Sequence, residues 1–369
     1  MRSINTWFVI VFKYGFSVLK TISFRRSLVA HKRRNLTDRP HHPVRLADVA
    51  RHAGVSSATV SRVLSRPEMV TEATRAAVMA AVAATGYRVN LAARNLRKQR
   101  TGAIVALVPN LGNPFFARLL SGMGHELMAE GYDLLVGDTM ATGGRHRALR
   151  RFLDTSRADG IILLDGQVTA ADLASLPGAP PLVTACEWIE GADLPRIVLD
   201  NQRGTELATG HLLTLDHRRI AFIGGPEVNV LHRARLEGMI RALGTAPPGY
   251  AGDFTLAAGA RAAGIWLAED PATRPTAIVA FSDELAAGFM GEVQRHGIAI
   301  PRQVSVVGFD GIDWGAHLPT PLTTIRQPRH AMGRVAARTL LAHMRGGGDL
   351  STTLTPELVI RASSGRVSG

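Results

Sequence analysis

Residues 54–64 read Gly-Val-Ser-Ser-Ala-Thr-Val-Ser-Arg-Val-Leu (GVSSATVSRVL), a helical segment with one unusual face. Val60, Val63 and Leu64 form an apolar stripe along such a helix. The opposite side carries small side chains and a single cation: Ser57, Ala58, Ser61 and Arg62. Because a solvated helix face usually carries long charged side chains, this face is better suited to close approach to another surface.

Two further predicted helices surround this segment. Residues 45–53 (RLADVARHA) carry apolar side chains at helical spacing, and Gly54 then supplies a sharp turn. Ser56 is the expected N-cap of the second helix. Residues 70–87 give a third helix that ends at Gly86. A helix, a glycine turn and a second helix at this spacing are typical of a helix-turn-helix unit.

The net charge of +13 is concentrated at the N-terminal end of the chain. Residues 1–43 carry a net charge of +8 and residues 44–100 a net charge of +7. Residues 101–369 therefore carry −2. A basic head on a nearly neutral body predicts that the head meets a polyanion, although a merely soluble basic surface remains the alternative from charge alone.

Residues 1–43 contain no apolar run long enough to span a membrane and no clear secretory signal. We expect a disordered basic extension there, or an artefact of an upstream start codon. Cys186 is the single cysteine, which excludes a disulfide framework and a cysteine-rich zinc site. The histidines show no paired metal-binding spacing. These observations predict a cytoplasmic protein with no membrane partner, no metal and no cofactor.

From Thr101 onward, β-branched apolar runs alternate with helical stretches over about 260 residues. This rhythm predicts an α/β body with doubly wound parallel sheets. Several predicted strands end in polar residues: Asn110, Asp138, Asp165, Asp283 and Asp310. Ligands of such folds bind beyond the carboxyl ends of the strands, so these residues predict a polar crevice.

No catalytic constellation is evident in this body. The sequence has no phosphate-binding P-loop, no nucleophile elbow and no dinucleotide fingerprint after the first strand. Asp283 lies at a strand-to-helix junction, where a helix cap and a ligand-binding role are equally plausible. An enzyme is therefore disfavoured and no catalytic residue is assigned.

The segment LADVARHAGVSSATVSRVLSRPEMVTEATRAAVMAAVAATGYRVNLAARNLRK (residues 46–98) closely resembles the head of the lactose-repressor (LacI/GalR) family of bacterial transcription regulators. The body continues the resemblance with IVALVPNLGNPFF, HRRIAFIGGP, PTAIVAFSDELAAG, VSVVGFD and PLTTIRQP, up to about Ser364. Within the family it is most similar to the cytidine-responsive branch. The resemblance implies a two-lobed, periplasmic-binding-protein-like body and four segments: a basic extension (1–43), a helix-turn-helix domain (44–90), a hinge helix (91–100) and an effector-binding and dimerisation domain (101–364).

The resemblance also implies how the head contacts operator DNA. Ser57 and Ala58 match the positions that choose bases, and Arg62 matches a base-contacting position. An arginine there can form a bidentate pair with guanine, worth about 1–3 kcal/mol of discrimination. Hydroxyl side chains nearby are better suited to phosphate contacts, namely Thr59, Ser61 and Ser65.

In the family, the hinge helices of two subunits enter the minor groove together. Leu96 matches the leucine that wedges between base pairs, and Ala93 would let the two helices approach closely. Arg97 is one of several cations that would neutralise phosphates. Without the preceding head, a plain basic linker would be the better interpretation of this segment.

The resemblance further implies a small-molecule effector site in the crevice. Arg235 and Asp310 match positions that hydrogen-bond the effector, and Phe254 matches an aromatic residue that stacks on it. The remaining candidates are Phe115, Phe116, Glu187, Trp188 and Asp283, although Phe116 suits core packing slightly better. Asn229 and Leu231 depart from the residues of the purine-sensing members, so a purine base is not expected as the effector. A nucleoside or a monosaccharide is expected instead.

These features predict a ligand-responsive transcriptional repressor that binds a pseudo-palindromic operator as a homodimer. The alternative is a periplasmic-type sugar-binding protein, which has the same body fold but no helix-turn-helix. The C-terminal ASSGRVSG shows no heptad repeat for tetramer formation, so a dimer is favoured.

Overall fold

The computed structural model describes residues 44–88, 95, 100–140, 144–153, 155–176, 178–348 and 350–367. The chain divides into two compact units between Val89 and Asn90. The predictions for residues 1–43 lie outside the described residues, as do those for Ala93, Leu96 and Arg97.

The N-terminal unit is a cluster of helices: α1 (Leu46–Ala53), α2 (Ser57–Ser65), the short 3-10 helix η1 (Pro67–Met69) and α3 (Glu72–Thr85). Val49 of α1, Val60 and Val63 of α2 and Val78 of α3 are buried together and form its core. Gly54 connects α1 to α2 with φ 66°, a left-handed conformation that costs glycine little. The predicted helix-turn-helix is therefore confirmed.

The first lobe of the C-terminal unit has a six-stranded parallel sheet of order β11-β5-β4-β3-β1-β2. Its strands are β1 (Ala103–Val108), β2 (Asp133–Asp138), β3 (Gly160–Leu163), β4 (Leu182–Ala185), β5 (Arg196–Leu199) and β11 (Thr352–Leu354). Its helices are α5 (Phe115–Ala129), α6 (Gly144–Phe152), α7 (Ala170–Ala174) and α12 (Arg329–Met344). The strand β1 (AIVALV) is buried almost throughout, as its position between two neighbours requires.

The second lobe has a six-stranded sheet of order β12-β10-β9-β8-β6-β7, in which only β12 runs antiparallel to its neighbour. Its strands are β6 (Ile220–Ile223), β7 (Gly249–Tyr250), β8 (Ala277–Ala280), β9 (Ser305–Asp310), β10 (Thr323–Arg326) and β12 (Glu357–Val359). Its helices are α8 (Asn201–Thr214), α9 (Val230–Leu243), α10 (Leu256–Ala268), α11 (Asp283–Arg295) and the 3-10 helix η2 (Asp313–His317). The predicted α/β class with two doubly wound parallel sheets is confirmed.

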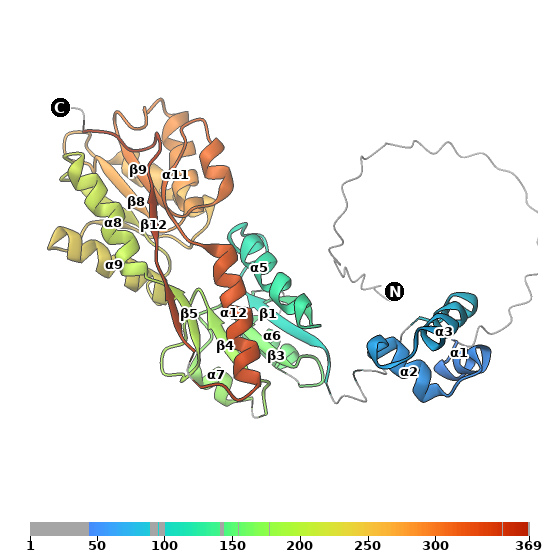
Figure 1. Ribbon diagram of the computed structural model, residues 1–369. Coiled ribbons are helices and arrows are strands. Elements are labelled where there is room, and N and C mark those ends of the chain that lie inside the picture. The colour runs from blue at the N-terminus through green and yellow to red at the C-terminus, as the bar shows by residue number, and fades with distance from the viewer. Residues whose placement is uncertain are drawn as a thin grey trace, which may run out of the picture. The chain divides into compact units, whose positions relative to one another are not determined.

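The chain crosses between the two lobes three times, from β5 to α8, from β10 to α12 and from β11 to β12 (Figure 1). Helix α12 returns to the first lobe and lies beside α5, where glycines allow the two backbones to meet. A Cβ atom on Gly122 of α5 would lie 2.1 Å from the carbonyl oxygen of His330, and one on Gly333 would lie 2.0 Å from that of Leu119. These three connections join the two lobes into one body, with the hinge where the chain crosses between them.

Candidate nucleic-acid interface and ligand pocket

The N-terminal face of α2 carries the predicted DNA-reading residues on the surface of the first unit. Ser57, Ala58, Arg62 and Ser65 are exposed, whereas Thr59 and Ser61 are partly buried. The Ser56 hydroxyl caps the helix by accepting a hydrogen bond from the Thr59 N–H at 3.1 Å. Because this cap is fixed at the start of α2, the small exposed side chains that follow are held on one helical face.

The cavity of the second unit has a volume of about 600 Å³ and is lined by residues from both lobes. Six of the eight predicted effector residues line it: Phe115, Phe116, Glu187, Arg235, Phe254 and Asp310. The first three belong to the first lobe and the others to the second. Because the cavity lies between two hinged lobes, a bound molecule touches both of them.

Backbone strain is concentrated around this cavity. Among the described residues, four non-glycine residues have positive φ, and three of them line the pocket: Cys186 (69°), Phe254 (63°) and Asp310 (121°). Such conformations cost non-glycine residues free energy and persist only where the surroundings enforce them. Here they occur directly after β4 (Cys186), in the loop after β7 (Phe254) and at the last residue of β9 (Asp310).

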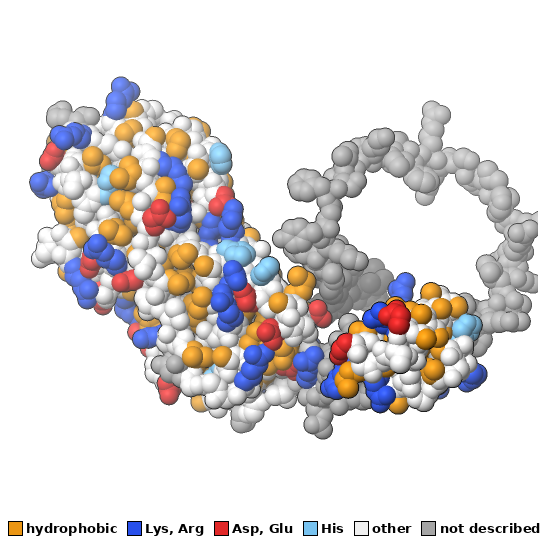
Figure 2. All heavy atoms as spheres, in the orientation of Figure 1, with side chains coloured by type: hydrophobic (Ala, Val, Ile, Leu, Met, Phe, Trp, Pro, Cys, Tyr) orange, Lys and Arg blue, Asp and Glu red, His pale blue; other side chains and the backbone are white. Residues whose placement is uncertain are grey.

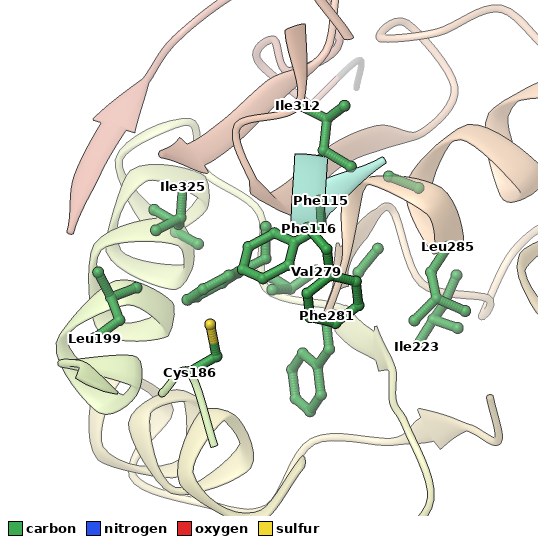
Figure 3. Close-up of a cluster of buried hydrophobic side chains, with 14 of the residues drawn as sticks. Phe115, Phe116, Cys186, Leu199, Ile223, Val279, Phe281, Leu285, Ile312 and Ile325 are labelled. Carbon is green, nitrogen blue, oxygen red and sulfur yellow. The ribbon is translucent and has the colours of Figure 1, made fainter. Parts of the chain in front are cut away.

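Aromatic rings form part of the cavity wall. Phe115 and Phe116 meet edge to face with ring centroids 5.2 Å apart, and both are largely buried. Figure 3 shows them in one apolar cluster with Cys186. The Phe254 ring lies directly on the backbone of Gly225, where an added Cβ would approach its Cε2 atom to 2.1 Å. The Phe254 ring can therefore lie here only because residue 225 has no side chain.

Arg235 and Asp310 form a buried polar centre in the second lobe. The Arg235 Nη2 atom lies 4.0 Å from Oδ1 of Asp310, and its Nε donates a hydrogen bond to Oδ1 of Asn201 at 2.9 Å. The guanidinium also covers the Phe309 ring at 3.8 Å from its centroid. Burial raises the pKa of Asp310 to about 6, against the opposing effect of the Arg235 charge. Arg235 can donate hydrogen bonds to a ligand, and Asp310 can accept them.

Glu187 connects the two lobes. Its Oε2 accepts a hydrogen bond from the Gly166 N–H at 2.5 Å in the first lobe. Its Oε1 accepts one from Nδ2 of Asn229 at 3.2 Å, at the start of α9 in the second lobe. Burial raises the pKa of this carboxyl to about 7, and the nearby Asp165 carboxylate adds to the shift.

Two ion pairs outside the cavity also cross between the lobes. Arg233 of α9 lies 2.6 Å from the Glu190 carboxylate in the first lobe. Arg118 of α5 lies 2.7 Å from the Asp313 carboxylate in the second lobe. All four side chains are solvent-exposed, so each of these two pairs contributes little free energy. A third pair joins the lobes where α12 begins, because the buried Arg329 lies 3.2 Å from the Asp313 carboxylate.

The first lobe contributes a polar pair to the cavity, Arg145 and Asp165, that was not predicted from the sequence as part of the site. Asp165, which is almost fully buried, accepts a hydrogen bond from Nε of Arg145 at 2.7 Å and another from the hydroxyl of Thr139. Arg145 and Asp165 both line the cavity. Asp165 was noted only as a polar strand end, and Arg145 lies in a helix whose sequence (GRHRALRRF) gives no sign of which arginine points inward.

Two predicted effector residues do not line the cavity. Asp283 is fully buried, and its carboxylate accepts hydrogen bonds from the Ile312 N–H and the Thr324 hydroxyl, each at 2.6 Å. The cap of α11 is Ser282, which itself lines the cavity. Trp188 also lies outside the lining, although its neighbour Glu187 lies in it. Neither residue lines the cavity, so direct contact of Asp283 or Trp188 with an effector stays a prediction.

Among the described residues, no group of three histidine, cysteine, aspartate or glutamate side chains is arranged to hold a metal ion. Within the same part of the chain, no helix is both long and apolar enough to cross a membrane. Acidic and basic side chains are interspersed over the visible face of the C-terminal unit, in keeping with its small net charge (Figure 2).

Comparison with known proteins gives a family match in each of the two units. Residues 45–90 match the family of bacterial regulatory proteins, lacI family, and residues 209–364 match the periplasmic binding protein-like domain. The HTH-type transcriptional repressor CytR of Escherichia coli (strain K12) is 35% identical over 328 residues, which cover 86% of this chain and 96% of that protein. The repressor PurR of Aliivibrio fischeri (strain MJ11) is 32% identical over 330 residues, covering 86% and 97%.

Solved structures show the same architecture. The lac repressor dimer bound to operator and the anti-inducer ONPF superposes with a TM-score of 0.78 at 26% identity, covering 88% of this chain and all of that one. The fold and the two sites define a transcription regulator with a DNA-binding head and a two-lobed ligand-binding body. The chain belongs to the lacI family of bacterial regulatory proteins, and its relatives are repressors rather than enzymes.

Proposed function

We propose that this protein is a dimeric repressor that binds a pseudo-palindromic operator and changes its operator affinity when a nucleoside or monosaccharide binds between the lobes. The observation that carries the proposal is the cavity of about 600 Å³ shared by two hinged lobes in a chain with a helix-turn-helix head. Such a body converts ligand binding into a change of lobe spacing.

The proposal assigns one task to each segment. Residues 44–90 bind the operator, residues 91–100 form the hinge and residues 101–364 bind the effector and the second subunit. The place of action is the cytoplasm, where the DNA lies and where a buried free Cys186 stays reduced. The exposed apolar side chains of β2, Leu135 and Val136, suit a surface that a second subunit covers.

In the head, the exposed residues of α2 read the major groove. Arg62 is long enough to reach a base edge and forms no ion pair with any residue that the structure describes. Ser57 and Ala58 lie one helical turn before it and are small enough to let the helix enter the groove. The hydroxyls of Thr59, Ser61 and Ser65 contact phosphates. In the hinge, Leu96 wedges into the minor groove, while Ala93 and Arg97 support the paired helices.

In the body, the cavity matches a flat or ring-shaped molecule with polar edges. Phe115, Phe116 and Phe254 supply apolar faces for a base or a sugar ring. Arg235 and Asp310 supply the donor and acceptor pair that adjacent hydroxyls require. Glu187 supplies an acceptor that bridges the lobes.

The proposal is tested with full-length protein and genomic fragments selected by their binding to it. Fluorescence anisotropy should show tight binding that weakens steeply with salt, because each neutralised phosphate makes the slope of log K against log salt more negative by about 0.9. Adding the correct nucleoside or sugar should shift the operator affinity. Equal binding to selected and random DNA would contradict the assignment of a specific repressor.

The effector is found independently by thermal shift against panels of nucleosides and monosaccharides. A ligand at a hundredfold its dissociation constant stabilises the protein by about 2.7 kcal/mol, which gives a readily measured rise in melting temperature. A compound that raises the melting temperature but leaves operator affinity unchanged would separate ligand binding from regulation.

A further inference from the structure

Negative charge is in excess around the cavity. Five carboxylates line it: Asp138, Asp165, Glu187, Asp253 and Asp310. The same lining contains two guanidinium groups, and no lysine is found among its residues. A ligand that enters this space therefore meets more acceptors than cations.

Both cations are already engaged by carboxylates of the cavity itself. The Arg145 Nε atom donates to Asp165 at 2.7 Å. Arg235 faces Asp310 and donates its Nε hydrogen to Asn201. A phosphate group would have to compete with these internal partners, and each broken pair would leave a buried carboxylate without its counterion.

Backbone donors at the cavity edge are engaged in the same way. The Asp138 carboxylate accepts hydrogen bonds from the N–H groups of Leu111 and Met140, at 3.2 and 2.7 Å. Glu187 accepts from Gly166 at 2.5 Å, as described above. Loops with free N–H groups commonly cradle phosphates, but here the protein's own carboxylates occupy those donors.

The helix ends that face the cavity are also capped by neutral side chains. Helix N-termini attract anions because their first N–H groups lack partners. Asn113 accepts from the first-turn N–H of α5 at 2.8 Å, Asn229 from that of α9 at 2.8 Å and Ser282 from that of α11 at 3.1 Å. These caps remove donors that a phosphate would otherwise use.

We propose that the cavity selects an uncharged ligand rich in hydrogen-bond donors and rejects the phosphate monoester of the same compound, an inference that rests on the proposed function. Glu187 is the specificity-determining residue, because it is the carboxylate of this lining that accepts hydrogen bonds from neutral donors of both lobes. Burial and the Asp165 carboxylate raise the pKa of Glu187 to about 7, so the cavity already disfavours the negative charge of the Glu187 carboxylate. A dianion would increase this cost.

This selectivity determines which pool of metabolite the regulator senses. The effector is the free compound, which uptake or phosphate-ester hydrolysis supplies and which phosphorylation removes. The repressor then responds to the free compound, which is the substrate of a kinase or a phosphorolytic enzyme, and it does not respond to the phosphorylated product.

The test uses full-length protein and matched probes: cytidine with cytidine 5′-monophosphate, and ribose with ribose 5-phosphate. In addition, a small-molecule cell extract is separated by anion exchange into an unretained fraction and a retained, anionic fraction. Thermal shift and calorimetry are measured with every probe. We expect stabilisation by the unretained fraction and by a free compound, and at least about 100-fold weaker binding of its monoester.

Stabilisation by the anionic fraction, or equal binding of a monoester, would overturn the inference and leave the proposed function standing. No stabilisation by either fraction would contradict the proposed effector function itself and the ligand class with it.

A pair of variants tests the role of Glu187. Glu187→Gln keeps an acceptor for the Gly166 N–H but removes the charge, so the preference for the free compound should shrink by about tenfold. Asp193→Asn, an exposed carboxylate in the same connection between β4 and β5, is the matched control and should leave the preference unchanged. An unchanged preference in Glu187→Gln would remove Glu187 as the specificity-determining residue.

Discussion

The carboxylate of Asp159 holds Thr101 by two hydrogen bonds, from its backbone N–H at 2.6 Å and from its Oγ1 at 2.9 Å. The other carboxylate oxygen accepts the N–H of Gly102 at 2.9 Å. The Thr101 carbonyl in turn accepts a hydrogen bond from Nδ2 of Asn95 at 2.8 Å. The segment that leads into β1 is therefore fixed to the loop before β3. A movement of the first lobe would be transmitted through these hydrogen bonds to the proposed hinge.

Asp159→Ala should loosen this attachment. A hydrogen bond to a charged group contributes about 1.5–3 kcal/mol, so local opening near Thr101 should become at least about tenfold more frequent. Trypsin cleavage after Arg100 measures this opening in the full-length protein. Asp193→Ala removes an exposed carboxylate elsewhere in the same lobe, and trypsin should cleave this variant at the wild-type rate. A wild-type rate in Asp159→Ala would show that other contacts hold the segment.

Arg62→Ala should cost about 1–3 kcal/mol of affinity for the operator and little for random DNA, because a base contact discriminates and a phosphate contact does not. Arg62→Lys keeps the charge but loses the planar fork, so it should retain binding to random DNA and still lose most of the operator preference. Anisotropy titrations on both DNAs measure the ratio. If affinity falls equally on both, Arg62 contacts phosphate.

The architecture could be predicted from the sequence because its signals are local. Gly54, the Ser56 cap and the apolar stripe of Val60 and Val63 each act within a few residues, and all three appear in the structure. The alternation of β-branched runs with helices likewise predicts parallel sheets, since buried strands need apolar residues on both faces. Of the five polar strand ends, all but Asp283 line the cavity, at the carboxyl ends of the strands.

The details of the cavity could not be predicted because they depend on contacts between distant segments. Arg145 and Asp165 meet across 20 positions, and one of several arginines in α6 makes that contact. Trp188 and Glu187 are adjacent in sequence, but only Glu187 lines the cavity. Asp283 resembles a strand-end ligand in sequence, but the structure uses it to hold the backbone of Ile312.

Gly225→Ala should weaken effector binding by about tenfold while the protein still folds, because the new Cβ would displace the Phe254 ring. Calorimetry with the effector found in the thermal-shift screen measures the loss. Gly264→Ala is the matched control, since a Cβ at that position in α10 meets nothing within 4 Å. That control should bind normally and gain about 0.5–1 kcal/mol of stability from better helix propensity. Normal binding in Gly225→Ala would show that Phe254 does not contact the effector.

Arg235→Ala should abolish the response of operator binding to the effector while operator binding itself persists, because the head carries the DNA contacts. It should also lower the free energy of unfolding of the body by about 3 kcal/mol, since it leaves Asp310 buried without its counterion. Arg241→Ala, an exposed arginine of the same helix, should change neither quantity. Denaturant unfolding and operator titrations with effector separate the two effects, and a normal effector response would remove Arg235 from the site.

Glu187→Gln should stabilise the protein in a manner that depends on pH. Burial raises the pKa of this carboxyl from 4.5 to about 7 in the folded state, so between these values the folded protein holds a proton that the unfolded chain has lost. The free energy of unfolding of the wild type therefore decreases as pH rises through this window, and the glutamine variant lacks this contribution. We expect nearly equal melting temperatures at about pH 5 and an advantage of about 5 °C for the variant at about pH 8. Asp193→Asn should show no such trend, and a difference for Glu187→Gln that stays constant with pH would mean that the carboxyl ionises normally in the cavity.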